Sequence, residues 1–284
     1  MRRNLFLIFW GICFSLFCFA GIARADNYKK VIAWDVDGVI VDSARETYIV
    51  SMESLKRHEE EIKTTFGNPV KEYSYEEFYK DRPFVKKAYE FFLHAFSRSF
   101  IGKSADQLSE KDRREFYTKY KSLIEKLTET FYSIRKEFQN ENINSWYDLN
   151  PVYPGIPEAM KHLKEMGFEF VVMSSKDKVS IWSLFTRHGI QKYFDESMIF
   201  DNTTGKDRRE QMENIQKKVG SDNEFVIIDD LPDQLAINRA AMKDKKVQYI
   251  GAKWGYGMGW DKYPFVHLVE KPELLPKIIG ELSK

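Results

Sequence analysis

The spacing of apolar residues divides the chain of 284 residues into regions of different character. Between residues 43 and 150, apolar side chains recur three and four positions apart among many Glu and Lys residues, and no alternating strand pattern interrupts them. This spacing predicts consecutive amphipathic helices over 46–63, 75–100 and 111–140. We expect them to form a separate all-helical domain over residues 43–150.

Short apolar runs lie on both sides of this helical region and predict the strands of one sheet. They cover 31–34, 168–173, 198–200, 225–228 and 247–250. Segments with helical periodicity separate the later runs, and such alternation is typical of a parallel, doubly wound α/β sheet. The predicted fold class is therefore a Rossmann-like α/β core, residues 26–42 and 151–284, with the helical domain inserted. Ligands bind such sheets at the carboxyl ends of the strands.

The first 25 residues have the pattern of a secretory signal peptide. Two arginines precede an apolar stretch, and Ala23-Arg24-Ala25 offers the small residues typical of a signal-peptidase site. We therefore expect cleavage after Ala25 and a periplasmic or secreted protein. The alternative is an uncleaved membrane anchor that faces the periplasm, because the apolar stretch approaches the length that spans a bilayer.

The net charge argues against some classes of binding partner, and the positions of the cysteines argue against a disulfide. Removal of residues 1–25 takes away three arginines and no acidic residue, so 41 Lys and Arg remain against 43 Asp and Glu, a formal charge of −2. Without a strongly basic balance we expect no nucleic-acid partner, and after cleavage no contact with the membrane. Both cysteines lie within the apolar stretch, so the mature chain would carry no disulfide. Oligomeric state is left open.

Acidic residues stand at the end of the first predicted strand, in the segment 34–43 with the sequence WDVDGVIVDS. Asp35 follows the apolar run, Asp37 comes two residues later, and Gly38 permits a tight turn whose N–H groups can face a phosphate. Two carboxylates here suit a divalent cation, or a nucleophile with an acid–base partner. Surface calcium loops share the DxDG spacing, so this segment alone leaves both interpretations open.

The ends of later strands supply further polar groups. Ser174 follows the second strand, Asp229 and Asp230 follow the run at 225–228, and Lys206 opens a helix. Each alone could be a helix cap, a turn or a surface residue. Gathered at one edge of a sheet, they match what phosphoryl transfer requires: a nucleophile, a metal ion, and donors to the phosphoryl oxygens.

The order of these segments resembles the four motifs of the haloacid dehalogenase-like (HAD) phosphohydrolases. WDVDGVIVDS is similar to the first motif, VVMSSKD to the second, TTGKDRRE to the third and VIIDDLPDQLAINRA to the fourth. The stretch VYPGIPEAMKHLKEMGFEFVVMSSK and the later GAKWGYG resemble the phosphoglycolate-phosphatase branch. The resemblance covers about residues 31–43 and 151–260, and the helical insert stands where that branch carries its type 1 cap.

This resemblance implies a Mg²⁺-dependent phosphatase that acts on a small phosphorylated metabolite. Asp35 would attack phosphorus and form an aspartyl phosphate, and Asp37 would protonate the leaving oxygen and then activate water. Ser174, with the adjacent Ser175, and Lys206 would hold the phosphoryl oxygens. Mg²⁺ would be bound by the Asp35 side chain, the Asp37 backbone carbonyl and the fourth motif.

The third and fourth motifs depart from the usual family pattern. Asp229-Asp230 stands where many members have Gly-Asp. Counting from the strand end favours Asp230 as the metal ligand, whereas counting back from Asp233 favours Asp229, so both remain candidates, with Asp233 as a supporting residue. Lys206 lacks the usual Lys-Pro context, and Lys192 is the alternative.

Among the reactions of the family that the chain resembles, Asp37 favours hydrolysis of a phosphate ester over dehalogenation. Dehalogenases of this superfamily lack an acid at this position, since a halide leaves without a proton. Hydrolysis of a phosphate ester is therefore the leading hypothesis. A HAD phosphomutase, or a catalytically inactive binding protein with the same fold, is the alternative. None of the five histidines lies in a motif, which disfavours a zinc hydrolase.

Overall fold

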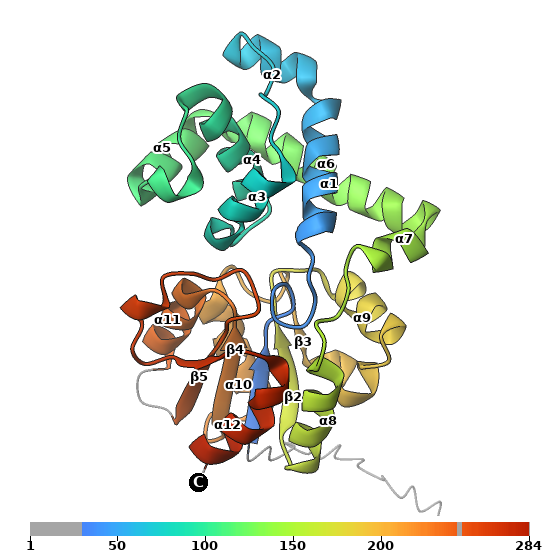
Figure 1. Ribbon diagram of the computed structural model, residues 1–284, viewed down its shortest axis with the longest axis vertical. Coiled ribbons are helices and arrows are strands. Elements are labelled where there is room, and N and C mark those ends of the chain that lie inside the picture. The colour runs from blue at the N-terminus through green and yellow to red at the C-terminus, as the bar shows by residue number, and fades with distance from the viewer. Residues whose placement is uncertain (1–29, 243–245, 284) are drawn as a thin grey trace, which may run out of the picture.

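The computed structural model describes residues 30–242 and 246–283, so the predicted signal peptide at 1–25 lies outside the described residues. The described chain has two parts, an α/β core and a group of helices above it (Figure 1). We call helices α1 to α7, residues 44–148, the cap. Within the described residues, no helix is long and apolar enough to cross a membrane.

Six parallel strands form one sheet in the order β3-β2-β1-β4-β5-β6. They are β1 (Lys30–Trp34), β2 (Glu169–Met173), β3 (Ile199–Phe200), β4 (Glu224–Asp229), β5 (Val247–Ala252) and β6 (His267–Val269). In the centre, β1 lies between β2 and β4, with Val31 opposite Glu169 on one side and Phe225 on the other. The carboxyl end of β1 therefore lies between those of β2 and β4, at the centre of the sheet. The sequence did not predict β6.

Helices cover both faces of the sheet. They are α8 (Ile156–Glu165), α9 (Lys178–Arg187), α10 (Arg208–Val219), α11 (Pro232–Ala241) and α12 (Leu275–Leu282). Alternate residues of β1 pack on opposite sides: Ile32 and Trp34 against α8, α9 and α12, and Val31 and Ala33 against α10 and α11. Because both faces are buried, the strands read as continuous apolar runs. The predicted doubly wound fold with a helical insertion is confirmed.

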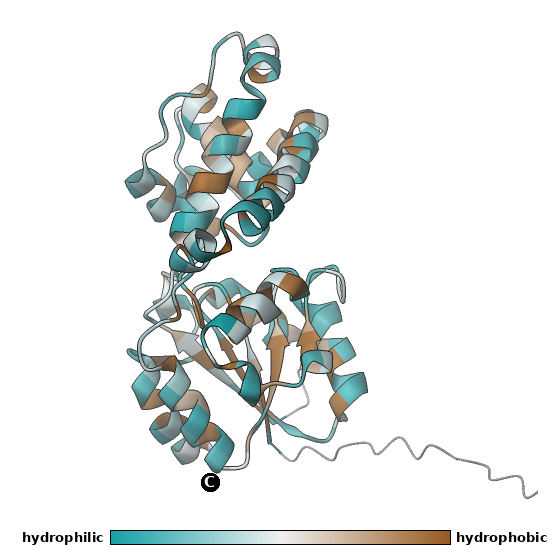
Figure 2. Ribbon diagram, turned by 90° about the vertical axis from the view of Figure 1, so that its right-hand side faces the viewer, coloured by the Kyte–Doolittle hydropathy of each residue, from teal (hydrophilic) through white to brown (hydrophobic). Residues whose placement is uncertain are grey.

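The cap consists of seven helices packed around aromatic side chains. They are α1 (Ala44–Arg57), α2 (Glu59–Phe66), α3 (Tyr75–Asp81), α4 (Tyr89–Phe96), α5 (Glu110–Lys119), α6 (Lys121–Glu141) and α7 (Ile143–Asp148). Figure 2 shows mainly hydrophobic residues on the strands of the sheet, and hydrophobic and hydrophilic residues mixed along the helices. All seven helices fall within the predicted limits of 43 and 150, which stay a prediction.

Each of the three long helices predicted for the cap is broken in the structure. The breaks fall at His58, at a 3₁₀ turn (Arg82–Phe84) and at Tyr120. Pro83 has no N–H for the helical hydrogen-bond ladder, which accounts for the second break. Ser109 begins α5 as a capping residue, since its side chain accepts from the Asp112 N–H and the Asp112 side chain accepts in return.

A buried ion pair joins three cap helices. Arg135 of α6 donates from Nε and Nη2 to the two carboxylate oxygens of Glu46 in α1, each at 2.7 Å. The Trp146 indole N–H of α7 donates to the same carboxylate at 3.4 Å. Such a bidentate pair fixes the relative position of these helices, because removal of one partner would leave the other charge buried and unpaired.

A neutral histidine is buried in the cap. His94 of α4 is 1% exposed, and neither ring nitrogen has a hydrogen-bond partner among the described residues. Burial lowers the pKa of His94 to about 3; nearby Arg113 and Arg98 act in the same direction, and Asp81 opposes them. Below pH 6.5 a histidine in the unfolded chain binds a proton that His94 in the folded protein does not bind. Stability should therefore decrease as the pH falls below that value.

We expect His94 to reduce the free energy of unfolding by about 2 kcal/mol between pH 7 and pH 5. His94→Leu keeps an apolar side chain of similar volume and should lack this part of the pH dependence. Denaturant unfolding of both proteins at pH 7, 6 and 5 measures the difference. If the free energy of unfolding changes equally with pH in both proteins, the prediction is wrong.

Candidate active site

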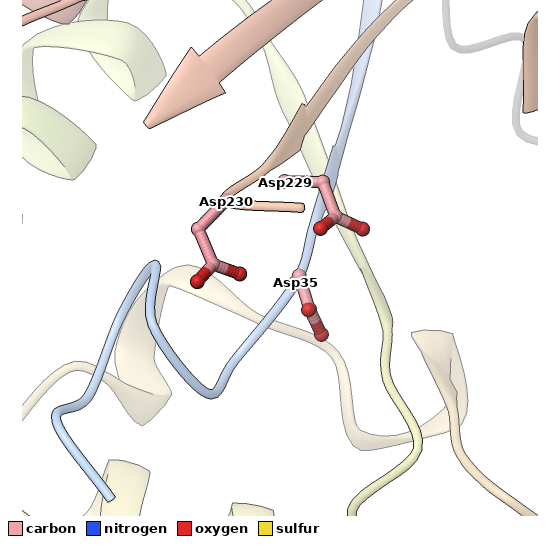
Figure 3. Close-up of side chains that lie close together, drawn as sticks. All are labelled: Asp35, Asp229 and Asp230. Atoms are coloured by element: carbon pink, nitrogen blue, oxygen red, sulfur yellow. The ribbon is translucent and has the colours of Figure 1, made fainter. Parts of the chain in front are cut away.

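The ends of two adjacent strands bring three aspartates together. Asp35 directly follows β1, Asp229 ends β4, and Asp230 comes next. Each offers a carboxylate oxygen, and these oxygens lie within 4.8 Å of one another. Figure 3 shows the three side chains converging from the two strand ends. All three are buried, and the Asp35 N–H donates to the Ile228 carbonyl of β4 at 3.0 Å, which continues the strand pairing.

The three carboxyl groups of the cluster have one guanidinium in ion-pair contact. Arg208 lies beside it, with Nη2 at 2.8 Å from Asp35 Oδ2 and 3.3 Å from Asp229 Oδ2. Burial, and then repulsion from Asp35, raises the pKa of Asp229 well above its ordinary value. Burial also raises the pKa of Asp230 to about 7, against the attraction of Arg82. Three carboxylates beside one guanidinium form a set of hard oxygen ligands that fits a divalent cation.

Asp37 lies in the loop after β1 and is paired with a lysine. Lys176 Nζ is 3.1 Å from Asp37 Oδ1, and the lysine side chain has no exposed surface. Burial alone would raise the pKa of Asp37, but the combined attraction of Lys176, Arg82 and Arg135 holds that pKa below its ordinary value. Asp35 and Asp37 line the same cavity, as expected for a nucleophile and an acid–base partner.

Gly38 lies against the metal-binding candidates and has a backbone conformation that favours glycine. Its φ is +85°, and a Cβ at this position would overlap the carboxylate of Asp230. Its N–H donates to the Val41 carbonyl at 2.8 Å. This N–H therefore already has a backbone acceptor, and the contact of the turn with a phosphate stays a prediction. What Gly38 permits is the close approach of Asp230.

A glycine-rich segment encloses Asp230 from the other side. A Cβ at Gly255 or Gly257 would overlap Asp230, and the Tyr256 N–H donates to Asp230 Oδ2 at 2.8 Å. The Tyr256 hydroxyl donates to Asp42 Oδ1 at 2.9 Å and accepts from the Ser43 N–H at 2.8 Å. One tyrosine thus links the aspartate cluster to the start of the cap.

A cavity of about 380 Å³ is lined by residues of both the core and the cap. Among the predicted site residues, its walls include Asp35, Asp37, Asp230, Ser175 and Lys206. Cationic cap residues also face it: Arg82, Lys86, Lys87 and Arg135. The apolar part of the wall includes aromatic rings of the cap: Tyr89, Phe91, Phe131 and Tyr132.

Other predicted site residues have different surroundings. Ser174 is buried, and its Oγ accepts from the Lys176 N–H at 3.3 Å. Asp233, expected to support the metal ligands, accepts from Lys86 Nζ at 2.8 Å and from the Tyr263 hydroxyl. Lys192 lies in a 3₁₀ turn and over the ring of Tyr193. None of these is in the part of the cavity wall that the structure describes.

Sequence reasoning missed Lys176, Arg208 and Tyr256 as residues of this region. Lys176 and Arg208 stand inside the second and third motifs, and Tyr256 stands in the GAKWGYG segment, so each had a local signal. The sequence offered Arg82 only as a cap residue that could reach a second anionic group of the substrate, with a surface position favoured, because helical periodicity marks packing faces and not cavity walls. The structure buries Arg82 at the cavity wall.

The chain belongs to the haloacid dehalogenase-like hydrolase family, whose sequence model matches residues 29–241. The expectation of a hydrolase of this family is therefore confirmed. No curated protein matches the sequence at a significant level.

Solved structures share the whole architecture at low sequence identity. A protein described as a predicted phosphoglycolate phosphatase, from Haemophilus somnus, is 15% identical with a TM-score of 0.61; the match covers 89% of this chain and 98% of that one. A protein of similar description from Lactobacillus delbrueckii is 17% identical with a TM-score of 0.63 and the same coverage. The β-phosphoglucomutase of Clostridium difficile is 16% identical with a TM-score of 0.53, covering 89% and 96%. At these identities the likeness establishes the fold.

We expect Gly38→Ala to weaken binding of a divalent cation such as Mg²⁺, because the new Cβ would displace Asp230. Bound cation should stabilise the native protein by about 2.7 kcal/mol at a hundredfold excess over its dissociation constant. Thermal unfolding with and without Mg²⁺ measures this, and the stabilisation should be largely lost in the variant.

Gly67→Ala is the matched control. Gly67 has a similar φ of +79° but open space around a Cβ, so the substitution adds backbone strain without any overlap. It should keep the Mg²⁺-dependent stabilisation. An unchanged Mg²⁺ effect in Gly38→Ala would show that Asp230 is not a ligand, or that it tolerates the displacement.

Proposed function

We propose that this protein is a Mg²⁺-dependent phosphatase that hydrolyses a small phosphate monoester through an aspartyl phosphate on Asp35. The observation that carries the proposal is the buried cluster of Asp35, Asp229 and Asp230, which borders a cavity that Asp37 and several cations also face. Family membership supports hydrolysis. The names of the structural neighbours, one described as a predicted phosphoglycolate phosphatase, one of similar description and one a β-phosphoglucomutase, support a phosphate ester as the substrate class.

In the first half-reaction an Asp35 carboxylate oxygen forms a bond to phosphorus, and the bond between phosphorus and the ester oxygen breaks. Asp37 donates a proton to the leaving oxygen, so an alcohol departs. In the free protein, burial raises the pKa of Asp37 and the stronger combined attraction of Lys176, Arg82 and Arg135 lowers it. The negative charge of the bound phosphate ester opposes this attraction and so favours the protonated form of Asp37. The pairing of Asp35 with Arg208 orients the nucleophile toward the cavity. Lys206 and Ser175, on the cavity wall, donate to the phosphoryl oxygens.

In the second half-reaction Asp37 takes a proton from water, and the water oxygen bonds to phosphorus. The bond between phosphorus and Asp35 breaks, which releases inorganic phosphate and restores both carboxyl groups to their starting states. Lys176 keeps Asp37 in position through both steps.

Asp35, Asp229 and Asp230 would hold Mg²⁺ together with the Asp37 backbone carbonyl. These carboxylates are buried, and Asp229 Oδ2 accepts no hydrogen bond from the described residues, although Arg208 Nη2 lies 3.3 Å from it; both observations support a bound cation. The ion would neutralise negative charge on the phosphoryl oxygens. Oxygen ligands next to a phosphate are the setting in which proteins bind Mg²⁺.

We expect residues 26–284 to release phosphate from small phosphate esters only with Mg²⁺, and Asp35→Asn to lower kcat by roughly 10³-fold or more. The amide keeps the shape of the side chain but is a poor nucleophile. Asp222→Asn, at an exposed loop position, is the matched control and should leave kcat unchanged. Turnover that persists in Asp35→Asn would contradict the assigned nucleophile.

The same assay separates the alternatives. Interconversion of sugar phosphates without net phosphate release would identify a phosphomutase. Binding of Mg²⁺ without turnover of any ester would favour an inactive binding protein.

We also propose that the phosphatase is exported, with the signal peptide cleaved after Ala25. The pattern of residues 1–25 supports this, and these residues lie outside the described part of the chain. N-terminal sequencing of the exported protein should find Asp26 first, and Ala25→Leu should block cleavage. A membrane-bound protein that keeps its N-terminus would support the anchor instead.

A further inference from the structure

One buried arginine at the cavity has no carboxylate partner among the described residues. Three arginines are buried in the described chain. Arg135 pairs with Glu46, and Arg208 pairs with Asp35 and Asp229. Arg82 forms no such ion pair; its Nη1 donates to the Val85 carbonyl at 3.2 Å, and its Nε has no partner. A buried guanidinium without an ion-pair contact is unfavourable, and an anionic ligand would remove that cost.

Arg82 is held in place at the cavity wall. It begins the 3₁₀ turn after α3, and the preceding Asp81 is buried and fixed by Arg98, with contacts of 2.6 and 2.7 Å, and by the Tyr73 hydroxyl at 2.7 Å. The Arg82 guanidinium lies over the ring of Tyr256, 4.3 Å from its centre. Because its backbone and its side chain are both restrained, Arg82 is preorganised to receive a ligand.

Arg82 lies at the same cavity as two aspartates of the site, Asp37 and Asp230, and is in ion-pair contact with neither. Tyr256, on which it stacks, donates its N–H to Asp230. Cations of the core also line the cavity: Lys176, Lys206 and Arg208. Arg82 adds a buried guanidinium from the cap that is in ion-pair contact with no carboxylate of the described residues. A bound phosphoryl group would supply the negative charge that Arg82 lacks at contact distance.

We propose that Arg82 binds the phosphoryl group that is transferred, so that the cap supplies one ligand of the reacting group. A guanidinium can donate two parallel hydrogen bonds to phosphoryl oxygens. The inference rests on the proposed function and deepens it. Under it the active site is complete only with the cap over the core. The competing source of negative charge is a second acidic group elsewhere on the substrate.

The test compares Arg82→Ala and Arg82→Lys with the wild-type protein on two kinds of ester. p-Nitrophenyl phosphate has no anionic group besides its phosphate, and the second set of esters carries an additional carboxylate or phosphate. We expect Arg82→Ala to lower kcat/KM by roughly 10²–10³-fold on both kinds and to weaken inhibition by inorganic phosphate. Arg82→Lys should recover part of the loss. Added guanidinium ion, far below denaturing concentrations, should partly restore Arg82→Ala.

Arg45→Gln is the matched control, because Arg45 is also a cap arginine over a tyrosine ring, at 4.7 Å from the centre of Tyr75, but is not part of the described cavity wall. It should keep the wild-type kcat/KM. If Arg82→Ala does not fold, as judged by its unfolding transition, Arg82→Lys carries the comparison.

Two results would overturn the inference. A loss confined to esters with an additional acidic group would assign Arg82 to that group, and wild-type values for both kcat/KM and phosphate inhibition would remove Arg82 from the site. If the wild-type protein hydrolyses no ester, the proposed function fails by itself. Calorimetry then measures how tightly wild type and Arg82→Ala bind inorganic phosphate in the presence of Mg²⁺. Weaker binding by Arg82→Ala would support the role of Arg82, and equal affinities would refute it.

Discussion

The buried convergence of Asp35, Asp229 and Asp230 is the constraint on which the rest of the site depends. Carboxylates are costly to bury, and mutual repulsion adds to the cost. They converge because β1 and β4 are adjacent parallel strands that end at the same edge of the sheet. Arg208 compensates part of the charge, and a divalent cation would compensate more. The glycines around Asp230 follow from the same constraint, since a side chain at Gly38 would occupy the space of the carboxylate.

The core and the cap contribute different things to the cavity. The strand ends of the core supply the carboxylates, whose positions are set by backbone hydrogen bonds of the sheet. The cap supplies aromatic rings and cations, whose positions depend on how its helices pack. The Glu46–Arg135 pair and the contacts of Asp81 make that packing definite. Tyr256 connects the two parts, because it binds Asp230 on one side and the start of α1 on the other.

This division explains how one architecture persists at 15–17% identity between this chain and its structural neighbours. A sheet with both faces covered requires apolar side chains of suitable volume, and many sequences meet that condition. The family model that assigns the chain to the hydrolases matches residues 29–241, which include the cap. Selection among substrates would depend on the cap side of the cavity, where similarity of fold does not determine which side chains are present.

The sequence by itself determined the α/β class, the alternation of strands and helices that makes the sheet parallel, the helical insertion, and the aspartates at the ends of β1 and β4. These follow from periodicity and from the rule that parallel strands end at one edge, both of which are local or topological. Only the tertiary structure brought Asp229 and Asp230 into one cluster with Asp35, engaged the Gly38 N–H with Val41, and placed Arg82 at the cavity without a carboxylate partner. The aspartate cluster depends on the pairing of strands that are far apart in the chain, and the place of Arg82 depends on the packing of the cap on the core, so no local period encodes either. The contact between Gly38 and Val41 is local, but it depends on backbone torsion angles that the apolar pattern does not specify.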